Sequence, residues 1–265
     1  MTSAGGSFPS ARTGTTRPIY LADHVFIIRA LILRRLRLRY HSQPAGFFLE
    51  FLRPAIVDIL HYYVFFWTNK PMPAGIQVEQ YVWAAFTVWF TFAQIMGSIS
   101  ASRGGSPIPF PGVSAMHMRL AICAWPVMIN IIFTFGSVFL MILFGDNIPV
   151  PNIPLTAFIL VVTATFALGL GLCFGAMGRA VPLIDPFLHV LPYFLFLGSG
   201  IYYSITNIPL AMANIFIWSP LLHLVEFERH AFDPGYPIGL VNLWYPFFCA
   251  VGVLVLGLAL SKRIR

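Results

Sequence analysis

Six long apolar runs constrain the fold of this chain more than any other feature of its sequence. They cover roughly residues 47–67, 81–98, 120–144, 155–177, 181–203 and 238–260. Each run has close to the ~20 residues that an α-helix needs to cross a bilayer. Only 9% of the residues are charged and 58% are hydrophobic, whereas soluble domains carry about 25% charged residues. The sequence therefore predicts an all-α integral membrane protein with six transmembrane helices.

The N-terminal part divides into two segments. Residues 1–18 are rich in Ser, Thr and Gly, and we expect a disordered cytoplasmic tail. Residues 19–45 contain an apolar stripe at helical spacing, made of Leu21, Val25, Ile28, Ile32 and Leu36. Five arginines accompany this stripe, namely Arg29, Arg34, Arg35, Arg37 and Arg39, of which Arg35 and Arg39 rotate back toward it. This pattern predicts an amphipathic helix in the lipid headgroup plane, although the arginines could instead serve only to set topology.

The distribution of basic residues predicts the orientation. Every lysine and arginine except Lys70 and Arg229 falls on one side of the six predicted spans. Cytoplasmic loops carry the excess of basic residues in membrane proteins. We therefore expect both termini in the cytoplasm. Residues 46–265 would form the transmembrane domain.

Residues 218–236 lie between two apolar runs but concentrate charge, and the orientation places them on the outer face. Glu226, Glu228 and Arg229 alternate with apolar residues, which predicts a short helix, half apolar and half polar, that Asp233-Pro234-Gly235 ends. His223, Glu226 and His230 share one face of this helix and could ligate a metal. Since no second segment supplies a ligand, a hydrogen-bonded cluster is the favoured interpretation, and we expect no metal.

The fourth and fifth runs carry the residues that shape helix packing. Gly171 and Gly175 are four residues apart, a spacing that lets two helices approach closely. We favour packing within one chain over a homodimer contact at this position. Pro192 and Gly198 predict that the fifth helix is kinked, or broken near its outer end.

Nucleotide binding and proton transfer within the membrane each require particular residues in the sequence. A phosphate-binding loop requires G-x-x-x-x-G-K-[ST], and neither Lys70 nor Lys262 has that context, so any ATPase must be another chain. Glu50, Asp58 and Asp185 lie in or near apolar runs, where carboxylates are functional candidates. Simple pairing of Glu50 with a nearby arginine, and of Asp58 with His61, is the alternative interpretation.

Three stretches carry a resemblance to a known family. The first is Trp218-Ser-Pro-Leu-Leu-His-Leu-Val-Glu226 followed by Pro234-Gly235-Tyr236, and the second is residues 33–40 with Gly46-Phe47 and Pro54. The third is the glycine-rich segment 169–178 with Pro182 and Ile208-Pro209. In this order they resemble the permease subunits of bacterial ABC transporters that export capsular polysaccharide and lipopolysaccharide O-antigen.

This resemblance implies an assembly in the bacterial inner membrane. Two copies of the chain would form a homodimeric channel among membrane lipids, above two copies of a cytoplasmic ABC ATPase that binds ATP and Mg. Residues 97–118 would be the cytoplasmic coupling loop, with Arg103, Pro109, Phe110 and His117 as its candidate contacts. The segment 108–112 lacks the basic, helix-favouring pattern expected of that loop. Residues 205–237 would form short re-entrant helices at the outer mouth.

The substrate implied by the resemblance is a lipid-linked glycan, and we expect no nucleic-acid partner. Arg34, Arg37 and Arg39 are the candidates for contact with its anionic head group. The candidates for the outer gate are Trp218, His223, Glu226 and Tyr236. We expect no catalytic residue and no cofactor in this chain. Two alternatives stay open: a membrane enzyme that uses His223 and Glu226 as acid and base, and a proton-coupled carrier that uses the intramembrane carboxylates.

Overall fold

A computed structural model describes residues 21–41, 45–69, 72–102, 113–143 and 151–263. Within these ranges the chain is helical, with connecting turns and no strand. The helices are α1 (Leu21–Tyr40), α2 (Ala45–Thr68), α3 (Val78–Ala101), α4 (Ala115–Leu143), α5 (Ile153–Ala180), α6 (Asp185–Leu197), α7 (Leu210–Phe216), α8 (Pro220–Phe232) and α9 (Trp244–Arg263). Short 3₁₀ turns cover Pro73–Gly75, Pro182–Ile184 and Ile205–Asn207. The predicted all-α class is confirmed.

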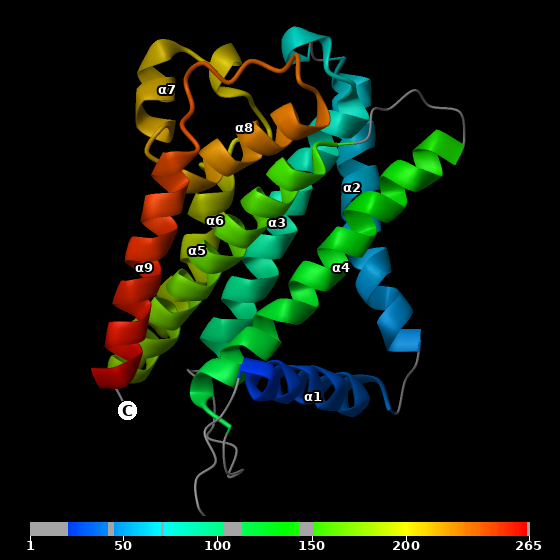
Figure 1. Cartoon of the computed structure of the whole chain (residues 1–265). Coiled ribbons are helices and arrows are strands. Elements are labelled where there is room, and N and C mark those ends of the chain that lie inside the picture. Colours follow the sequence, from blue (N-terminus) through cyan, green and yellow to red (C-terminus); the bar gives the residue numbers. More distant parts are fainter. Residues whose placement is uncertain (1–20, 42–44, 70–71, 103–112, 144–150, 264–265) are drawn as a thin grey trace, which may run out of the picture.

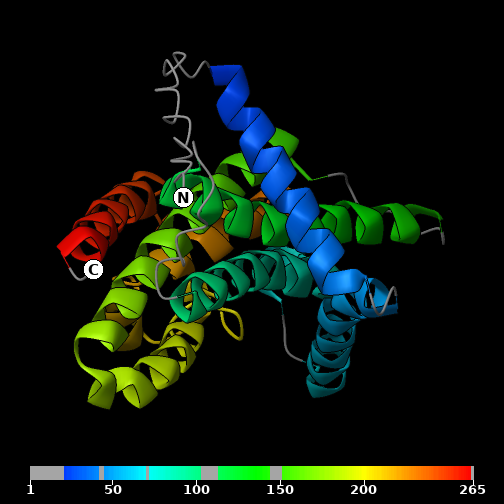
Figure 2. The ribbon, with the colours of Figure 1, turned by 90° about the horizontal axis from the view of Figure 1, so that it is seen from below.

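The long helices run side by side, and α1 and α8 lie across their ends (Figure 1). Helix α5 packs between α3 and α9, and α8 packs on α3, α5 and α9 at one end of the bundle. At the opposite end α1 crosses the bundle and packs mainly on α4, as the view from below shows (Figure 2). We call these the α8 end and the α1 end.

Four helices in the described part of the chain are long and apolar enough to cross a membrane: α3, α4, α5 and α9. Helices α7 and α8 together would be long and apolar enough for a further span, but the pair is bent by 105° at the break between them. Helices α2 and α6 lie at the predicted first and fifth runs. Helix α6 has only 13 residues, and the 3₁₀ turn at Pro182–Ile184 precedes it. The count of six spans therefore stays a prediction.

Close packing of α5 explains its glycines. A Cβ atom on Gly169 would lie 2.6 Å from the backbone nitrogen of Leu254 in α9, and one on Gly257 would lie 2.5 Å from the carbonyl oxygen of Gly169. On the other side, a Cβ on Gly171 would lie 2.9 Å from the carbonyl oxygen of Met96 in α3. These contacts lie within one chain, so the predicted role of the glycine segment in internal packing is confirmed.

The predicted break in the fifth helix is also confirmed. Helix α6 contains Pro192 and ends at Leu197. Gly200 follows with φ +76°, a left-handed conformation that glycine adopts without a steric penalty. The chain then turns into the short helices of the α8 end.

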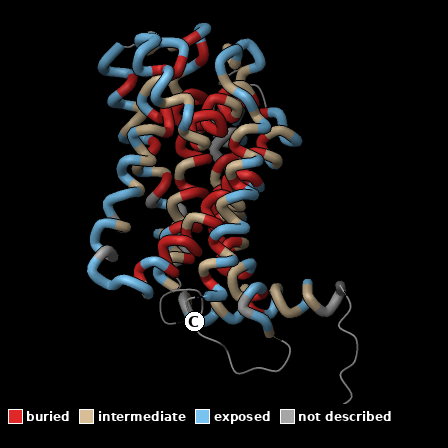
Figure 3. The backbone as a smooth tube through the Cα atoms, turned by 90° about the vertical axis from the view of Figure 1, so that its left-hand side faces the viewer, coloured by how far each residue is buried: buried red, intermediate tan, exposed pale blue. Residues whose placement is uncertain are grey.

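Helix α8 forms where the sequence predicts it, and it ends at Phe232 with Asp233 as its C-cap. The expectation of a half-polar helix is wrong in one respect. Glu226, Glu228 and Arg229 are fully buried, so its charged side chains face the protein interior rather than water. Buried residues follow the middle of the bundle, and exposed ones its outer side (Figure 3).

Candidate functional site

Arg229 is the centre of a buried polar cluster at the α8 end. Its Nη2 atom donates hydrogen bonds to the carbonyl oxygens of Gly200 (2.9 Å) and Ile201 (3.0 Å). Its Nη1 atom donates to the carbonyl oxygen of Tyr203 (3.2 Å) and to Oε1 of Glu226 (3.0 Å). The guanidinium carbon lies 3.6 Å from the ring centroid of Tyr81 in α3, a cation–π contact. One side chain thus joins α8, α3 and the turn after α6.

Glu226 completes this cluster. Its Oε2 atom lies 3.1 Å from the Ser204 hydroxyl and 3.0 Å from the Tyr236 hydroxyl, and Oε1 accepts from the backbone nitrogen of Ile205 (3.3 Å). Burial raises the pKa of the Tyr236 phenol above its ordinary value. The Tyr236 hydroxyl therefore stays protonated and can donate to Glu226. The carboxylate therefore has donors on both oxygens, and it holds the segment after α6 against α8.

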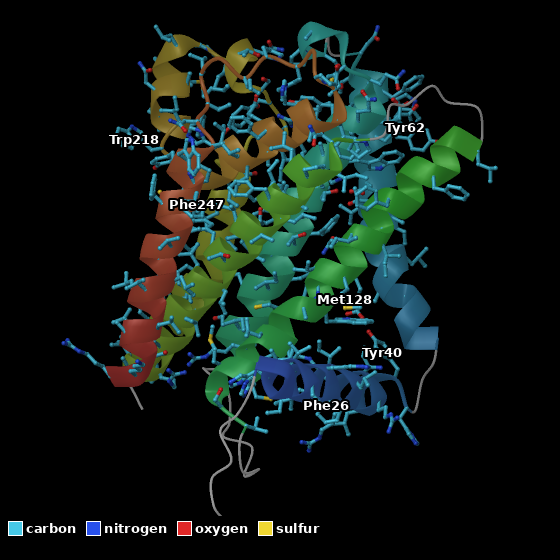
Figure 4. The ribbon with its side chains drawn as sticks, viewed as in Figure 1. Phe26, Tyr40, Tyr62, Met128, Trp218 and Phe247 are labelled. Carbon is cyan, nitrogen blue, oxygen red and sulfur yellow. The ribbon has the colours of Figure 1, made fainter. Side chains whose placement is uncertain are left out.

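His223 belongs to a neighbouring set of contacts. Its Nδ1 atom accepts a hydrogen bond from the backbone nitrogen of Asn242 (3.0 Å), so in the neutral ring Nε2 carries the proton. Nε2 donates to the carbonyl oxygen of Ile217 (2.8 Å). Trp218 is 72% exposed at the edge of the bundle (Figure 4), and only its backbone joins the set, through the Tyr245 hydroxyl (2.8 Å).

The structure thus brings together two of the four residues predicted for the outer gate. Glu226 and Tyr236 are in contact, His223 lies in a separate set, and Trp218 points away from both. Arg229, which joins the elements, was missed in the sequence. Arg229 follows Glu226 by three residues on the same helix, in a chain with few charges, and this spacing could have indicated the ion pair.

The described ranges contain no group of three His, Cys, Asp or Glu side chains that could hold a metal ion. His223 uses both ring nitrogens for backbone contacts. His230 uses Nδ1 for the carbonyl oxygen of Tyr236 (3.0 Å).

At the α1 end, two histidines join α1 to α4. Nδ1 of His24 lies 2.7 Å from Nε2 of His117. His117 is the one candidate coupling-loop residue whose structure is described, because Arg103, Pro109 and Phe110 lie outside the described residues. It lies on the first turn of α4, so the last residues of the predicted loop 97–118 are helical.

One face of α1 is covered by the bundle, and it comprises His24, Ile27, Ile28, Leu31, Ile32, Arg35 and Leu36. Arg34 and Arg37 are exposed, although Arg34 also borders a pocket between α1 and α4, and the side chain of Arg39 lies outside the described residues. Phe26, which is 71% exposed, points away from the bundle (Figure 4). Arg35 is the half-buried arginine on the covered face, and head-group contact by Arg34, Arg37 and Arg39 stays a prediction.

Two pockets meet at Arg35. The first, of about 510 Å³, lies between α1 and α4 and is lined by Leu31, Leu38, Met118 and Ile122 together with Arg34 and Arg35. The second, of about 270 Å³, is lined by Arg35, Glu50, Gln94, Ser98, Ile122 and Trp125. We call them the apolar pocket and the polar pocket.

The intramembrane carboxylates have different surroundings. Glu50 accepts a hydrogen bond from Nε1 of Trp125 (3.0 Å). Asp58 is buried, and its Oδ1 has no hydrogen-bond partner among the described residues. His61 bonds to the carbonyl oxygen of Val57 (2.7 Å) and to the Tyr202 hydroxyl (2.8 Å), so the predicted pair with Asp58 is wrong. The side chains of Arg53 and Asp185 lie outside the described residues.

Comparison with known proteins gives relatives over almost the whole chain, although no family model matches. The polysialic acid transport protein KpsM of Escherichia coli is 25% identical over 247 residues, which are 89% of this chain and 92% of that protein. The capsule polysaccharide export inner-membrane protein BexB of Haemophilus influenzae is 23% identical over 263 residues, 94% of this chain and 95% of that protein. The resemblance that the sequence motifs indicate is confirmed.

Proposed function

We propose that this relative of capsular-polysaccharide export permeases is itself the permease subunit of such an exporter, for a capsule or O-antigen type of glycan, in the bacterial inner membrane. The main support for this proposal is the similarity to two named export proteins over about nine-tenths of each chain. Four helices in the described residues are long and apolar enough to cross a membrane, which is consistent with the proposal.

The proposed topology has six spans: α2, α3, α4, α5, α6 and α9. Helix α2 has 24 residues, enough to cross a bilayer, and α6 would span together with its flanking turns. Helices α7 and α8, bent by 105°, would form the re-entrant segment of the outer mouth. Both termini would be cytoplasmic, since Lys262 and Arg263 end α9 at the same end of the bundle as the arginines of α1 (Figure 1).

Helix α1 would lie in the cytoplasmic headgroup layer. Its exposed side mixes Arg34 and Arg37 with Phe26 and Leu38. Such a mixture suits the boundary between headgroups and acyl chains, where basic groups contact anionic lipid and apolar groups are immersed. In this position Arg34, Arg37 and Arg39 would meet the anionic head group of a lipid-linked glycan.

Energy would come from a separate ABC ATPase, because this sequence has no phosphate-binding loop. Two copies of the chain would assemble with two ATPases, which bind ATP and Mg. Closure of the ATPases would push on residues 97–118 and open a path between the two copies of α2 and α6. The contact between His117 and His24 gives this movement a direct route from the loop to α1. Trp218, His223, Glu226 and Tyr236 would shape the outer gate.

The enzyme alternative is disfavoured by the surroundings of its two candidate residues. Glu226 is fully buried with donors on both oxygens, and both nitrogens of His223 contact backbone groups. A general acid or base must reach the substrate proton within hydrogen-bond distance. The carrier alternative has its best candidate in Asp58, but the relatives are named as exporters of polysaccharide rather than as carriers of small solutes.

The test is co-purification followed by transport. The tagged chain is extracted from its native host in mild detergent, and we expect an ABC ATPase in equal amount. Deletion of the gene should then stop export and leave glycan on the cytoplasmic side. An intact, folded chain that reproducibly lacks an ATPase would refute the proposal, as would normal surface glycan after deletion.

A further inference from the structure

Glu228 in α8 is a fully buried carboxyl group that takes no part in the cluster around Arg229. Neither of its oxygens has a hydrogen-bond partner among the described residues, and the same holds for the Thr156 hydroxyl of α5. Arg229, the residue next to it, has Glu226 as its ion-pair partner. Because an unpaired carboxylate is far costlier to bury than a neutral carboxylic acid, this geometry favours the protonated form of Glu228.

Glu228 lies in the contact between α8 and the start of α5. The carbonyl oxygen of Ala231, three residues later in α8, accepts a hydrogen bond from the backbone nitrogen of Asn152 (2.8 Å), the N-cap of α5. Thr156, four residues after Asn152, is the residue of α5 that acts on the Glu228 carboxyl group. The two pairs are thus one turn apart along both helices. Separation of α8 from α5 at this point would open the carboxyl group to water.

The ionisable groups on the helices around α8 are engaged elsewhere. Residues 153–172 of α5 include no ionisable side chain. From α3, the ring of Tyr81 lies against the guanidinium group of Arg229. From α9, Tyr245 packs on His223 and donates to the carbonyl oxygen of Trp218. The other ionisable side chains with contacts at this end bond to groups other than Glu228, and they are Tyr203, Glu226, His230 and Tyr236.

The surroundings of Glu228 decide how its charge depends on pH. It lies in α8, outside the six proposed spans. Burial raises the pKa of Glu228 from 4.5 to about 8, and the Thr156 hydroxyl lowers it by a smaller amount. A carboxyl group that reaches water would return to the lower value. The packed state therefore holds the proton more tightly, so its advantage over the separated state falls as the pH rises from 4.5 to about 8.

We infer that Glu228 is a proton switch in the contact that holds α8 on α5 at the outer mouth. With the proton bound, the neutral carboxyl group stays buried and α8 stays packed. When the proton is released to water, the carboxylate requires hydration and α8 separates from α5 more readily. Alkaline conditions outside the membrane should thus favour opening of the mouth. The position of the switch at the outer mouth rests on the proposed function, whereas the contact itself does not.

Amide hydrogen exchange of the purified full-length chain in phosphatidylcholine nanodiscs tests the switch. Protection factors, which correct for the intrinsic pH dependence of exchange, are measured for peptides of α8 and of the start of α5. In the unchanged chain, protection should fall about tenfold per pH unit from about pH 6 to about pH 8 and then level off, as the release of one proton requires. Glu228→Gln, which resembles the protonated carboxyl group, should abolish that fall.

Two further variants separate a proton switch from a purely structural role. Thr156→Val keeps the shape of the side chain but removes the hydroxyl that lowers the pKa of Glu228. Protection in this variant should level off at a higher pH than in the unchanged chain. Glu79→Gln is the matched control, because Glu79 is the one charged residue of α3 and lies in the first turn of that helix, close to Tyr81. It should keep the fall of the unchanged chain.

Several results would overturn the inference. An equal fall of protection in the unchanged chain and in Glu228→Gln would mean that another group titrates, as would an unmoved levelling point in Thr156→Val. Protection that does not vary with pH in the unchanged chain would exclude a switch altogether. Because the assay needs neither an ATPase nor a glycan, such a failure would leave the proposed function intact. Conversely, a chain without an ATPase partner could still show the switch.

Glycan export in cells tests the link between the switch and the outer mouth. The rate at which glycan appears on the surface should rise with external pH in cells with the unchanged chain. It should not rise in cells with Glu228→Gln. The same pH dependence in both would refute a role of Glu228 at the mouth, even if exchange in nanodiscs depends on it.

Discussion

Nε2 of His117 lies 2.7 Å from Nδ1 of His24 and joins the first turn of α4 to α1. His117 accepts a hydrogen bond at Nδ1 from the backbone nitrogen of Ser114 (3.0 Å), so its neutral ring donates from Nε2 to His24. The two residues are 93 positions apart in the chain. The contact connects the end of the predicted coupling loop, residues 97–118, directly to α1, which lines both pockets.

Substitution of either histidine should loosen α1. A part-buried neutral hydrogen bond contributes about 1 kcal/mol, so His24→Ala and His117→Ala should each speed amide hydrogen exchange in α1 several-fold. The double variant should exchange no faster than the more affected single variant, since both remove one contact. His41→Ala, an exposed histidine just beyond α1, is the control. Additive effects of the two substitutions would contradict a shared contact.

Three arginines of α1 should matter for export beyond their charge. Changing Arg34, Arg37 and Arg39 together to Gln should reduce glycan on the cell surface at least about tenfold, given the strength of charge-assisted contacts. The control changes Arg12, Arg17 and Arg29 to Gln, with the same loss of charge on the same side of the predicted spans. Surface glycan is quantified by glycan-specific antibody. Export at the level of the control would exclude these three residues as head-group contacts.

Arg229 should be the substitution at the α8 end with the greatest effect on stability. Arg229→Gln leaves the buried Glu226 without its ion-pair partner, and removal of one partner of a buried pair costs about 3–5 kcal/mol. We expect a clear fall in the melting temperature of the purified chain, read by tryptophan fluorescence. Arg263→Gln, at the exposed end of α9, should leave that temperature unchanged. Equal melting of the two variants would show that the Arg229 contacts contribute nothing.

Two glycines of α9 offer a matched test of helix packing. A methyl group on Gly257 would lie 2.5 Å from the carbonyl oxygen of Gly169, whereas one on Gly252 would meet nothing within 4 Å. Gly257→Ala should destabilise the chain by about 1–3 kcal/mol because α5 and α9 must move apart. Gly252→Ala should be neutral or stabilising by up to about 1 kcal/mol through helix propensity. Thermal unfolding in detergent separates the two, and a reversed order would contradict close packing at Gly257.

Helix positions followed from local features of the sequence. Helix α3 extends the predicted run 81–98 by only three residues at each end, to Val78–Ala101. Helix α5 extends the run 155–177 to Ile153–Ala180, and Asn152 caps its start through a hydrogen bond to the backbone nitrogen of Leu155 (3.2 Å). The last run was placed less well, since α9 begins at Trp244 rather than near residue 238. Hydropathy alone does not separate an apolar turn from an apolar helix.

The candidate site was predicted only in part. The rotation of Arg35 toward the apolar stripe was visible in the helical spacing, and the structure places it on the covered face. Its meeting with Glu50 and Trp125 depends on how α1, α2 and α4 cross. Helical spacing gives the relative direction of side chains along one helix, but it does not give the neighbour that each one meets.

By itself, the sequence determined that this chain is a helical membrane protein and where its helices break. Run length, proline, glycine and charge act locally, over a few turns of one helix. Only the tertiary structure decided which polar groups are buried and with which partners. Arg229 reaches the carbonyl oxygen of Tyr81, 148 residues away, because a charge inside the bundle is tolerated only where distant segments supply its hydrogen bonds. That partnership depends on the packing of α8 on α3, which no local pattern encodes.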